Sequence, residues 1–314
     1  MNNDINIAYR AYLHRNLVSY HKNLQQEIQN HTDLFNHCNS IENKKLIQIA
    51  RKQYLYCMFS AIDIFLTDSS IELLISYPAK IGNIKSDTEL LTDVSTLTSA
   101  IKYHAEKKIN ELSYKKPIEF LREVYAFFGE DLNKENPYIG LFVEGKATRD
   151  LFMHNGGKPN FIYFEKAGKF ARNLKEDQEI KIEDDYLKNV SNAIDHITDD
   201  ILCRCFVKHK DDIPPKIFQK MWEMSSLNEI VPFEKQWRYS EHTLFGPGII
   251  IEDFHHPWSH SEQALFNFFR QIHSGSGAQT DQLTPQDIPY ALMRWRGRPD
   301  ERIIQSWLEA PFYL

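Results

Sequence analysis

The stretch YLYCMFSAIDIFLTDSSIELL, Tyr54 to Leu74, decides how this chain folds. Its apolar side chains occur on most sides when the segment is wound at 3.6 residues per turn. That pattern is typical of a helix buried at the centre of a domain. The helix is expected to begin near residue 44 and to end at Tyr77, because Pro78 cannot continue it. The stretch therefore predicts a fold in which other helices surround a central one.

Helical patterns continue on both sides of this central segment. Between residues 5 and 36, apolar side chains recur at three-, four- and seven-residue steps and form one stripe along a helix. Further helices are expected at 92–113, 116–129, 136–157 and 182–206. Thr92 or Ser95 is the expected cap of the first of these. Asn155, Gly156 and Gly157 are expected to close the third, because they accept the left-handed backbone conformation that ends a helix. The sequence thus predicts an all-α fold.

The composition changes at KHKDDIPPK, Lys208 to Lys216, where Pro214 and Pro215 indicate a linker or a sharp corner. A change of this kind favours a domain boundary. We therefore expect three parts: an N-terminal helical extension at 1–43, a helical bundle at 44–207 and a mostly helical subdomain at 208–314.

The C-terminal part holds all five tryptophans of the chain. Five such side chains in about a hundred residues favour a small core of their own. The alternative is a surface that recognises a substrate or partner, since exposed aromatic side chains can stack on bases. Locally, GPGIIIEDF predicts a short strand, SHSE at Ser259–Glu262 predicts a capping box that opens a helix, and SGSGAQTDQLTPQDIP predicts a mobile loop.

Composition and charge limit the possible functions. The 314 residues carry a formal net charge of −6, whereas proteins that coat nucleic acid unspecifically are normally basic. A nucleic acid would have to be captured by a local patch; Lys102–Lys116 and Lys166–Lys175 are candidates, although a solvated surface explains both more simply. No apolar run could span a bilayer, the N-terminus does not resemble a secretory signal, and the four cysteines follow no disulfide or zinc spacing. We therefore expect a cytoplasmic protein with reduced thiols and no membrane partner.

The stretch KATRDLFMHNGG, Lys146 to Gly157, is the candidate site. Arg149 is always charged and offers forked donors that suit a phosphate, and a histidine such as His154 can take or give a proton. These two roles suffice to cleave RNA without a metal: a base removes the ribose 2′-hydroxyl proton, and an arginine neutralises charge on the phosphate. The simpler alternative is a surface pair at the end of an ordinary helix, because this spacing alone is common.

The spacing of the pair also bears on the oligomeric state. Residues five apart on a helix lie roughly 140° from each other around the axis. Arg149 and His154 therefore do not share one face, whereas Asp150 and His154, four apart, do. The pair can meet one phosphate only at a helix end or where a second copy completes the site. The sequence favours a homodimer.

The surroundings of the motif resemble the HEPN superfamily, in particular the group related to RiboL-PSP-HEPN proteins of bacterial defence systems. RDLFMHNGG is similar to that group's signature of an arginine, a polar residue, a short spacer and a histidine, often followed by Asn and Gly; Asp150 stands where Asn is commoner. Residues 54–81 resemble its early helix, with Asp63 at the acidic position. Residues 109–132 and 179–197 resemble its middle segment and closing helix, so the resemblance covers about residues 44–206.

The resemblance implies a HEPN-like bundle that dimerises and acts as a metal-independent endoribonuclease, leaving a cyclic phosphate and a 5′-hydroxyl. It implies catalytic roles for Arg149 and His154, a supporting role for Asp150, and auxiliary roles for Asp63 and Asn155. It also implies RNA as substrate, no cofactor, and a role in anti-phage defence or as a toxin, with an antitoxin or activating partner. Some HEPN domains are inactive, so the alternative is a non-catalytic module that binds a partner protein or RNA.

Two roles stay open at this stage. Asp63 fits a buried acid hydrogen-bonded within the bundle as well as a functional residue. Asp150 could orient and charge His154, or its own charge could weaken RNA binding.

The histidines His255, His256 and His260 invite a metal hypothesis, but their spacing is not a zinc pattern, and we expect a structural or surface role.

Overall fold

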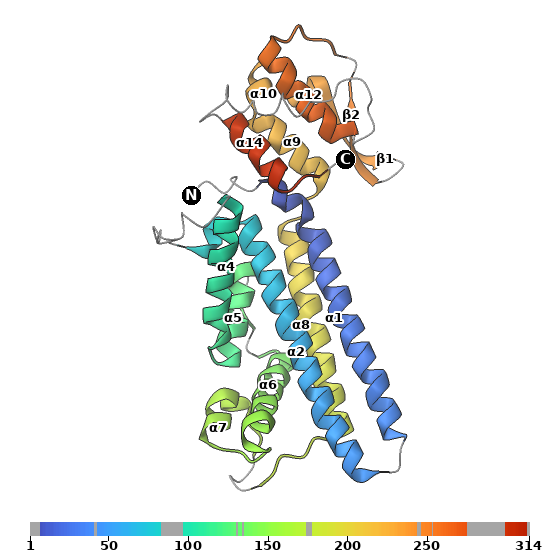
Figure 1. Cartoon of the computed structure of the whole chain (residues 1–314), viewed down its shortest axis with the longest axis vertical. Helices are drawn as coiled ribbons and strands as arrows, with labels where there is room; N and C mark the ends of the chain where they lie inside the picture. The colour runs from blue at the N-terminus through green and yellow to red at the C-terminus, as the bar shows by residue number, and fades with distance from the viewer. Residues whose placement is uncertain are drawn as a thin grey trace. The chain divides into compact units, whose positions relative to one another are not determined.

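The structure is a computed structural model that describes residues 7–40, 43–82, 97–129, 131–133, 135–173, 178–243, 246–252, 254–274 and 299–312. Within these residues the protein is all-α apart from one two-stranded sheet, which confirms the predicted fold class (Figure 1). Contacts divide the chain into two compact units: unit 1 comprises Met1–His14, Ile75–Ile101 and His209–Leu314, and unit 2 comprises Arg15–Leu74 and Lys102–Lys208. The three-part division at residues 43 and 207 stays a prediction.

Unit 2 is built from long helices at nearly the positions that the sequence predicts. Its helices, the first three of which also contribute residues to unit 1, are α1 (Arg10–Asn39), α2 (Lys44–Ser76), α4 (Leu97–Ser113), α5 (Pro117–Phe128), α6 (Pro137–Asn155), α7 (Phe161–Ala167) and α8 (Asp184–Lys208). Helix α7 and the 3-10 turn η3 (Gly168–Phe170) were not predicted. The expected caps Thr92 and Ser95 lie outside the described residues.

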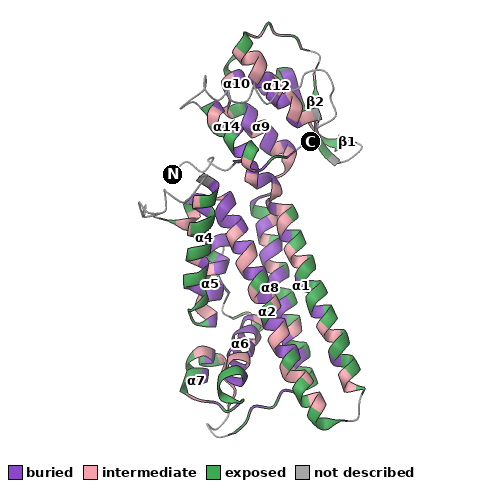
Figure 2. Cartoon of the chain, in the orientation of Figure 1, coloured by how far each residue is buried: buried purple, intermediate pink, exposed green. Residues whose placement is uncertain are grey.

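Polar contacts between side chains join the long helices of unit 2. Thr32 of α1 and Tyr54 of α2 share a hydrogen bond of 2.8 Å between their hydroxyl oxygens, and Arg51 Nε of α2 lies 2.7 Å from Asp184 Oδ1 of α8. These helices run side by side in Figure 1. Most apolar side chains of α2 between Tyr54 and Leu74 are buried (Figure 2), which confirms the predicted central helix.

Unit 1 contains shorter elements and the sheet. They are η1 (Ile7–Tyr9), η2 (Pro78–Ile81), α9 (Pro214–Met224), α10 (Ser226–Ile230), α11 (Phe233–Gln236), β1 (Trp237–Thr243), β2 (Gly246–Ile251), α12 (His260–Ser274) and α14 (Pro299–Glu309). Strands β1 and β2 pair antiparallel, with Trp237 opposite Ile251. The strand predicted from GPGIIIEDF is confirmed as β2, whereas β1 was not predicted.

Two local predictions in unit 1 have opposite outcomes. One half of the capping box is confirmed: the backbone N–H of Ser259 donates to Glu262 Oε2 at 2.7 Å, directly before α12. Of the two alternatives for Pro214 and Pro215, the linker is wrong, because both prolines lie in the first turn of α9, where a missing N–H costs nothing; the sharp corner stays a prediction. Beyond Ser274, the predicted mobile loop lies outside the described residues.

The tryptophans of unit 1 form the predicted core. Trp222 and Trp237 are fully buried with ring centroids 5.5 Å apart, and Trp307 joins them in one apolar cluster. Trp258 packs against this cluster from a partly buried position, and Trp295 lies outside the described residues. Burial of these rings favours a structural role over base stacking for this group.

A buried polar cluster in unit 1 contains Tyr77, His209 and Asp212. The Tyr77 hydroxyl donates to Asp212, and His209 Nδ1 lies 3.1 Å from Asp212 Oδ2. Burial by itself would raise the pKa of Asp212, but the hydrogen bonds from His209 and Tyr77 outweigh it and lower that pKa. His14 lies close enough to Asp212 for the carboxylate charge to raise the His14 pKa, and it forms a hydrogen bond with the backbone of His209.

His14 is expected to make the protein less stable in mild acid. Burial lowers the pKa of His14 from its ordinary 6.5, and the nearby Asp212 only partly opposes this. The unfolded chain therefore binds the proton at higher pH than the folded chain, so stability that is present above pH 6.5 is lost as the pH falls from that value through the lower pKa of the folded chain. One group can contribute at most about 1.4 kcal/mol per pH unit. Urea unfolding at pH 7.5 and at a mildly acidic pH should show a smaller loss for His14→Gln than for wild type; equal losses would contradict this role.

No helix among the residues that the structure describes is long and apolar enough to cross a membrane.

Candidate functional site

Helix α6 carries the motif, and its two ends are fixed by local chemistry. At its start, the Asn136 side chain accepts a hydrogen bond of 3.0 Å from the backbone N–H of Tyr138. At its end, Gly156 and Gly157 have φ values of 60° and 86°, so the predicted glycine stop is confirmed for these two residues. Asn155 is instead the last helical residue, and its amide donates to the Lys158 carbonyl at 2.6 Å.

Arg149 lies between two carboxylates. Its Nη2 is 2.9 Å from Asp63 Oδ2 on α2, and its Nη1 is 3.2 Å from Asp150 Oδ1 on α6. The buried Nε has no hydrogen-bond partner among the described residues. The structure therefore brings together three of the predicted site residues, Arg149, Asp150 and Asp63.

Two lysines extend this arrangement on either side. Lys146, one turn before Arg149, pairs with Asp63, and Lys166 of α7 lies 2.6 Å from Asp150 Oδ2. The five side chains alternate in charge along the order Lys146, Asp63, Arg149, Asp150 and Lys166, and we call them the ion-pair network. Three cations face two carboxylates, which leaves a formal charge of +1. The charge favours an anion, but each carboxylate competes with that anion for Arg149.

His154 stands apart from the ion-pair network. It is exposed in the last turn of α6, and within the described part of the chain it makes no hydrogen bond or ion pair. Both oxygens of Asp150 lie against Arg149 and Lys166, so the structure contains no contact in which Asp150 orients His154. This separation agrees with the angle of roughly 140° that the five-residue spacing gives.

Exposed apolar side chains lie near the end of α6. Met153 is 56% exposed, and at the start of α7 Phe161 is 74% and Ile162 56% exposed. Helix α7 packs against α6, and Lys166 of α7 bonds Asp150 of α6. We call Met153, Phe161 and Ile162 the apolar surface. Exposed apolar side chains at two neighbouring helix ends offer a candidate contact surface.

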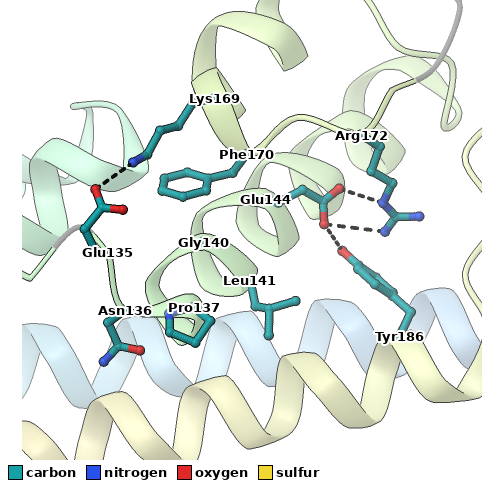
Figure 3. A pocket seen from close by; sticks show the side chains of 10 residues that line it. All are labelled: Glu135, Asn136, Pro137, Gly140, Leu141, Glu144, Lys169, Phe170, Arg172 and Tyr186. Carbon is teal, nitrogen blue, oxygen red and sulfur yellow. Dashed lines mark hydrogen bonds and ion pairs between the residues drawn. The ribbon is translucent and has the colours of Figure 1, made fainter.

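A second polar cluster, which the sequence did not predict, surrounds Glu144 of α6 (Figure 3). Glu144 is 5% exposed. It accepts hydrogen bonds from Thr148 Oγ1 at 2.6 Å, Tyr163 at 2.9 Å, Tyr186 at 2.8 Å and Arg172 Nε at 2.9 Å. These donors come from α6, α7, α8 and the segment after η3. The only sequence signal was a glutamate inside the apolar run IGLFVEG.

The tyrosines of the Glu144 cluster are held in their protonated form. Burial, reinforced by the Glu144 carboxylate, raises the pKa of Tyr163 to about 12 and raises the pKa of Tyr186 well above its ordinary value. Both hydroxyls therefore stay hydrogen-bond donors at physiological pH. Through these hydrogen bonds the cluster holds α7, the segment after η3 and α8 against α6.

The two lysine-rich segments are partly neutralised. Within them, described lysines lie near carboxylates in the pairs Lys102–Glu106, Lys115–Glu123, Lys116–Glu165, Lys166–Asp150 and Lys169–Glu135. Such pairs on a surface screen the positive charge and contribute little to stability. The positive charge of both segments is therefore reduced.

The histidine-rich stretch near residue 256 offers no metal site among the described residues. There, no group of three His, Cys, Asp or Glu side chains is placed to hold a metal ion. The His256 ring instead lies edge-on to Trp258 with centroids 4.6 Å apart. All four cysteines are free thiols.

Comparisons of the chain with protein families, with curated proteins and with solved structures found no match.

Proposed function

We propose that this protein is a metal-independent endoribonuclease of the HEPN type whose site is formed by Arg149 and His154. The observation that carries the proposal lies at the end of α6. There His154 is exposed and has no bonding partner among the described residues, and Arg149 lies in a network with the cations Lys146 and Lys166. A free imidazole can exchange protons with a substrate, and the net positive network can attract a phosphate.

The proposed reaction needs only these two groups and the RNA. His154 accepts the proton of the ribose 2′-hydroxyl, and the resulting oxygen attacks the adjacent phosphorus. The bond from phosphorus to the 5′-oxygen breaks, which leaves a 2′,3′-cyclic phosphate, and the protonated His154 gives its proton to the departing 5′-oxygen to form a 5′-hydroxyl. Arg149 neutralises the charge that builds on the phosphate oxygens. It must exchange one of its carboxylate partners for the phosphate to do so.

A second copy of the chain is part of this proposal. Within one chain, His154 does not contact Arg149, Asp150 or Asp63. A phosphate bound by the ion-pair network would therefore have to be met by the histidine of another copy. The apolar surface formed by Met153, Phe161 and Ile162 offers contact area beside His154. A homodimer built there would bring the histidine of one copy toward the arginine of the other.

The second candidate is a non-catalytic module that binds RNA or a partner protein. It is favoured by the two carboxylates on Arg149, which lie within 2.9 and 3.2 Å of the guanidinium. Two carboxylates neutralise this guanidinium, so a structural role in stabilising the fold explains its position as well as phosphate binding does. An antitoxin or an activating partner would bind most readily at the apolar surface.

Growth of an expressing host separates the two candidates. An active RNase should suppress growth, and the His154→Ala form should not. Equal growth with both forms at matched expression favours the binding module. A role in defence against phage, or as a toxin, rests on the resemblance.

Asp63→Asn is expected to strengthen RNA binding. The change removes one of the two negative charges that compete for Arg149 and frees Lys146, while the side-chain shape stays the same. The expected gain in affinity is about fivefold, roughly 1 kcal/mol for a partly exposed pair. Affinity would be measured in the His154→Ala background, so that RNA is not cleaved. Asp33→Asn, the same change at an exposed site on α1, is the matched control. Weaker or unchanged binding by Asp63→Asn would contradict the competition.

A further inference from the structure

A pocket of about 410 Å³ lies beside the first turns of α6. Figure 3 shows the Phe170 ring on one side, Leu141 and Pro137 on the opposite side, and Tyr186 at one end. Its volume is in the range of small-molecule sites, roughly 300–1,000 Å³. The pocket is formed entirely within unit 2 and does not include Arg149 or His154.

Most charged groups that line the pocket already have partners. Glu144 accepts from its hydroxyl and guanidinium donors, and Arg172 is held by that carboxylate and by the Lys181 carbonyl at 3.0 Å. The Asn136 oxygen caps α6, so the helix start does not present an open anion site. A ligand would therefore not be recognised chiefly through buried charge.

What the pocket offers a ligand is a mainly apolar slot in which Lys169 is the more exposed of the two lining cations. Phe170 is held close to the backbone of α6, because a Cβ on Gly140 would lie only 2.7 Å from its Cδ1. The rim carries Lys169, which is 59% exposed and pairs with the largely exposed Glu135 at 3.3 Å. An exposed pair of this kind opens at little cost. The slot suits a planar ring, and the lysine suits a negative group attached to it.

We propose that this pocket binds a nucleotide, with the base beside Phe170 and Leu141 and the phosphate at Lys169. The ligand is either a free nucleotide or one base of an RNA strand. The second case rests on the proposed function and would make the pocket a specificity subsite. Gly140 and Arg149 lie nine residues apart on α6, about 13.5 Å along the axis. The segment from α7 to Arg172 joins the two places, since Lys166 bonds Asp150.

The test uses full-length His154→Ala protein, which should not cleave RNA, in titrations with the four nucleoside monophosphates and with short single-stranded RNAs. Leu141→Trp fills the slot, and Lys169→Ala removes the rim cation without disturbing the core. Circular dichroism and thermal melting show that each variant is folded. The expected result is at least tenfold weaker binding for Leu141→Trp and about fivefold weaker binding for Lys169→Ala.

The two sources of the ligand give different results. Monophosphate binding that Leu141→Trp abolishes identifies a free nucleotide site; an effect on RNA binding alone identifies a strand base. If folded Leu141→Trp and Lys169→Ala bind every ligand as the parent does, or if the parent binds none, the proposal is overturned. RNA cleavage by wild type is scored separately: cleavage with no pocket effect rejects only the pocket, and nucleotide binding without cleavage rejects only the nuclease.

Discussion

His154→Ala is expected to abolish RNA cleavage while leaving the fold intact. General acid–base catalysis by one side chain contributes typically about 10²–10⁴-fold, so the rate should fall by at least that range. The side chain is exposed and makes no hydrogen bond or ion pair among the described residues. Its removal should therefore change the free energy of unfolding by less than about 0.5 kcal/mol. Single-turnover cleavage of a labelled RNA and urea unfolding measure the two quantities.

A matched control is available on another helix. His37 lies in the last turn of α1, as His154 lies in the last turn of α6. His37→Ala should leave the cleavage rate unchanged, which would show that the loss does not follow from removing any helix-terminal histidine. Cleavage by His154→Ala at the wild-type rate would remove this residue from the mechanism.

Of the variants described, Glu144→Ala is expected to lower the free energy of unfolding most. It removes a buried carboxylate that accepts from Thr148, Tyr163, Tyr186 and Arg172. Arg172 would keep its charge in a partly buried position without its carboxylate partner. Breaking such a pair costs about 3–5 kcal/mol. Urea unfolding of wild type and variant gives the difference directly.

Two controls separate the charge of Glu144 from its position. Glu144→Gln keeps the shape and some hydrogen bonds, so its loss should be smaller than that of alanine. Glu135→Ala removes an exposed carboxylate paired with Lys169 at 3.3 Å and should cost no more than about 1 kcal/mol. A loss for Glu144→Ala as small as that for Glu135→Ala would show that the Glu144 cluster does not hold the bundle together.

The helices could be predicted from sequence because their signals are local. The apolar run of α2, the glycines that end α6 and the Ser259–Glu262 capping box each depend on residues within one or two turns. Pro214 and Pro215 misled the prediction for a related reason. The same residue breaks a helix interior and begins a helix well, and only the tertiary context decides between the two.

The candidate site could be predicted only in part. The motif identified Arg149, and the resemblance pointed to Asp63, but their contact joins residues 86 positions apart and has no signal in the spacing. The same applies to Arg172, which meets Glu144 only after the chain turns back through α7. Asp150 was expected beside His154 by helical geometry. Two cations, Arg149 and Lys166, attract its carboxylate more strongly than a neutral imidazole would.

The most direct test of the proposed nuclease uses purified wild-type protein, Arg149→Ala and His154→Ala on total cellular RNA in EDTA, followed by end-group analysis of the products. We expect cleavage by wild type alone, with 2′,3′-cyclic phosphate and 5′-hydroxyl ends. No cleavage by folded wild type, or cleavage that both variants retain, would contradict it.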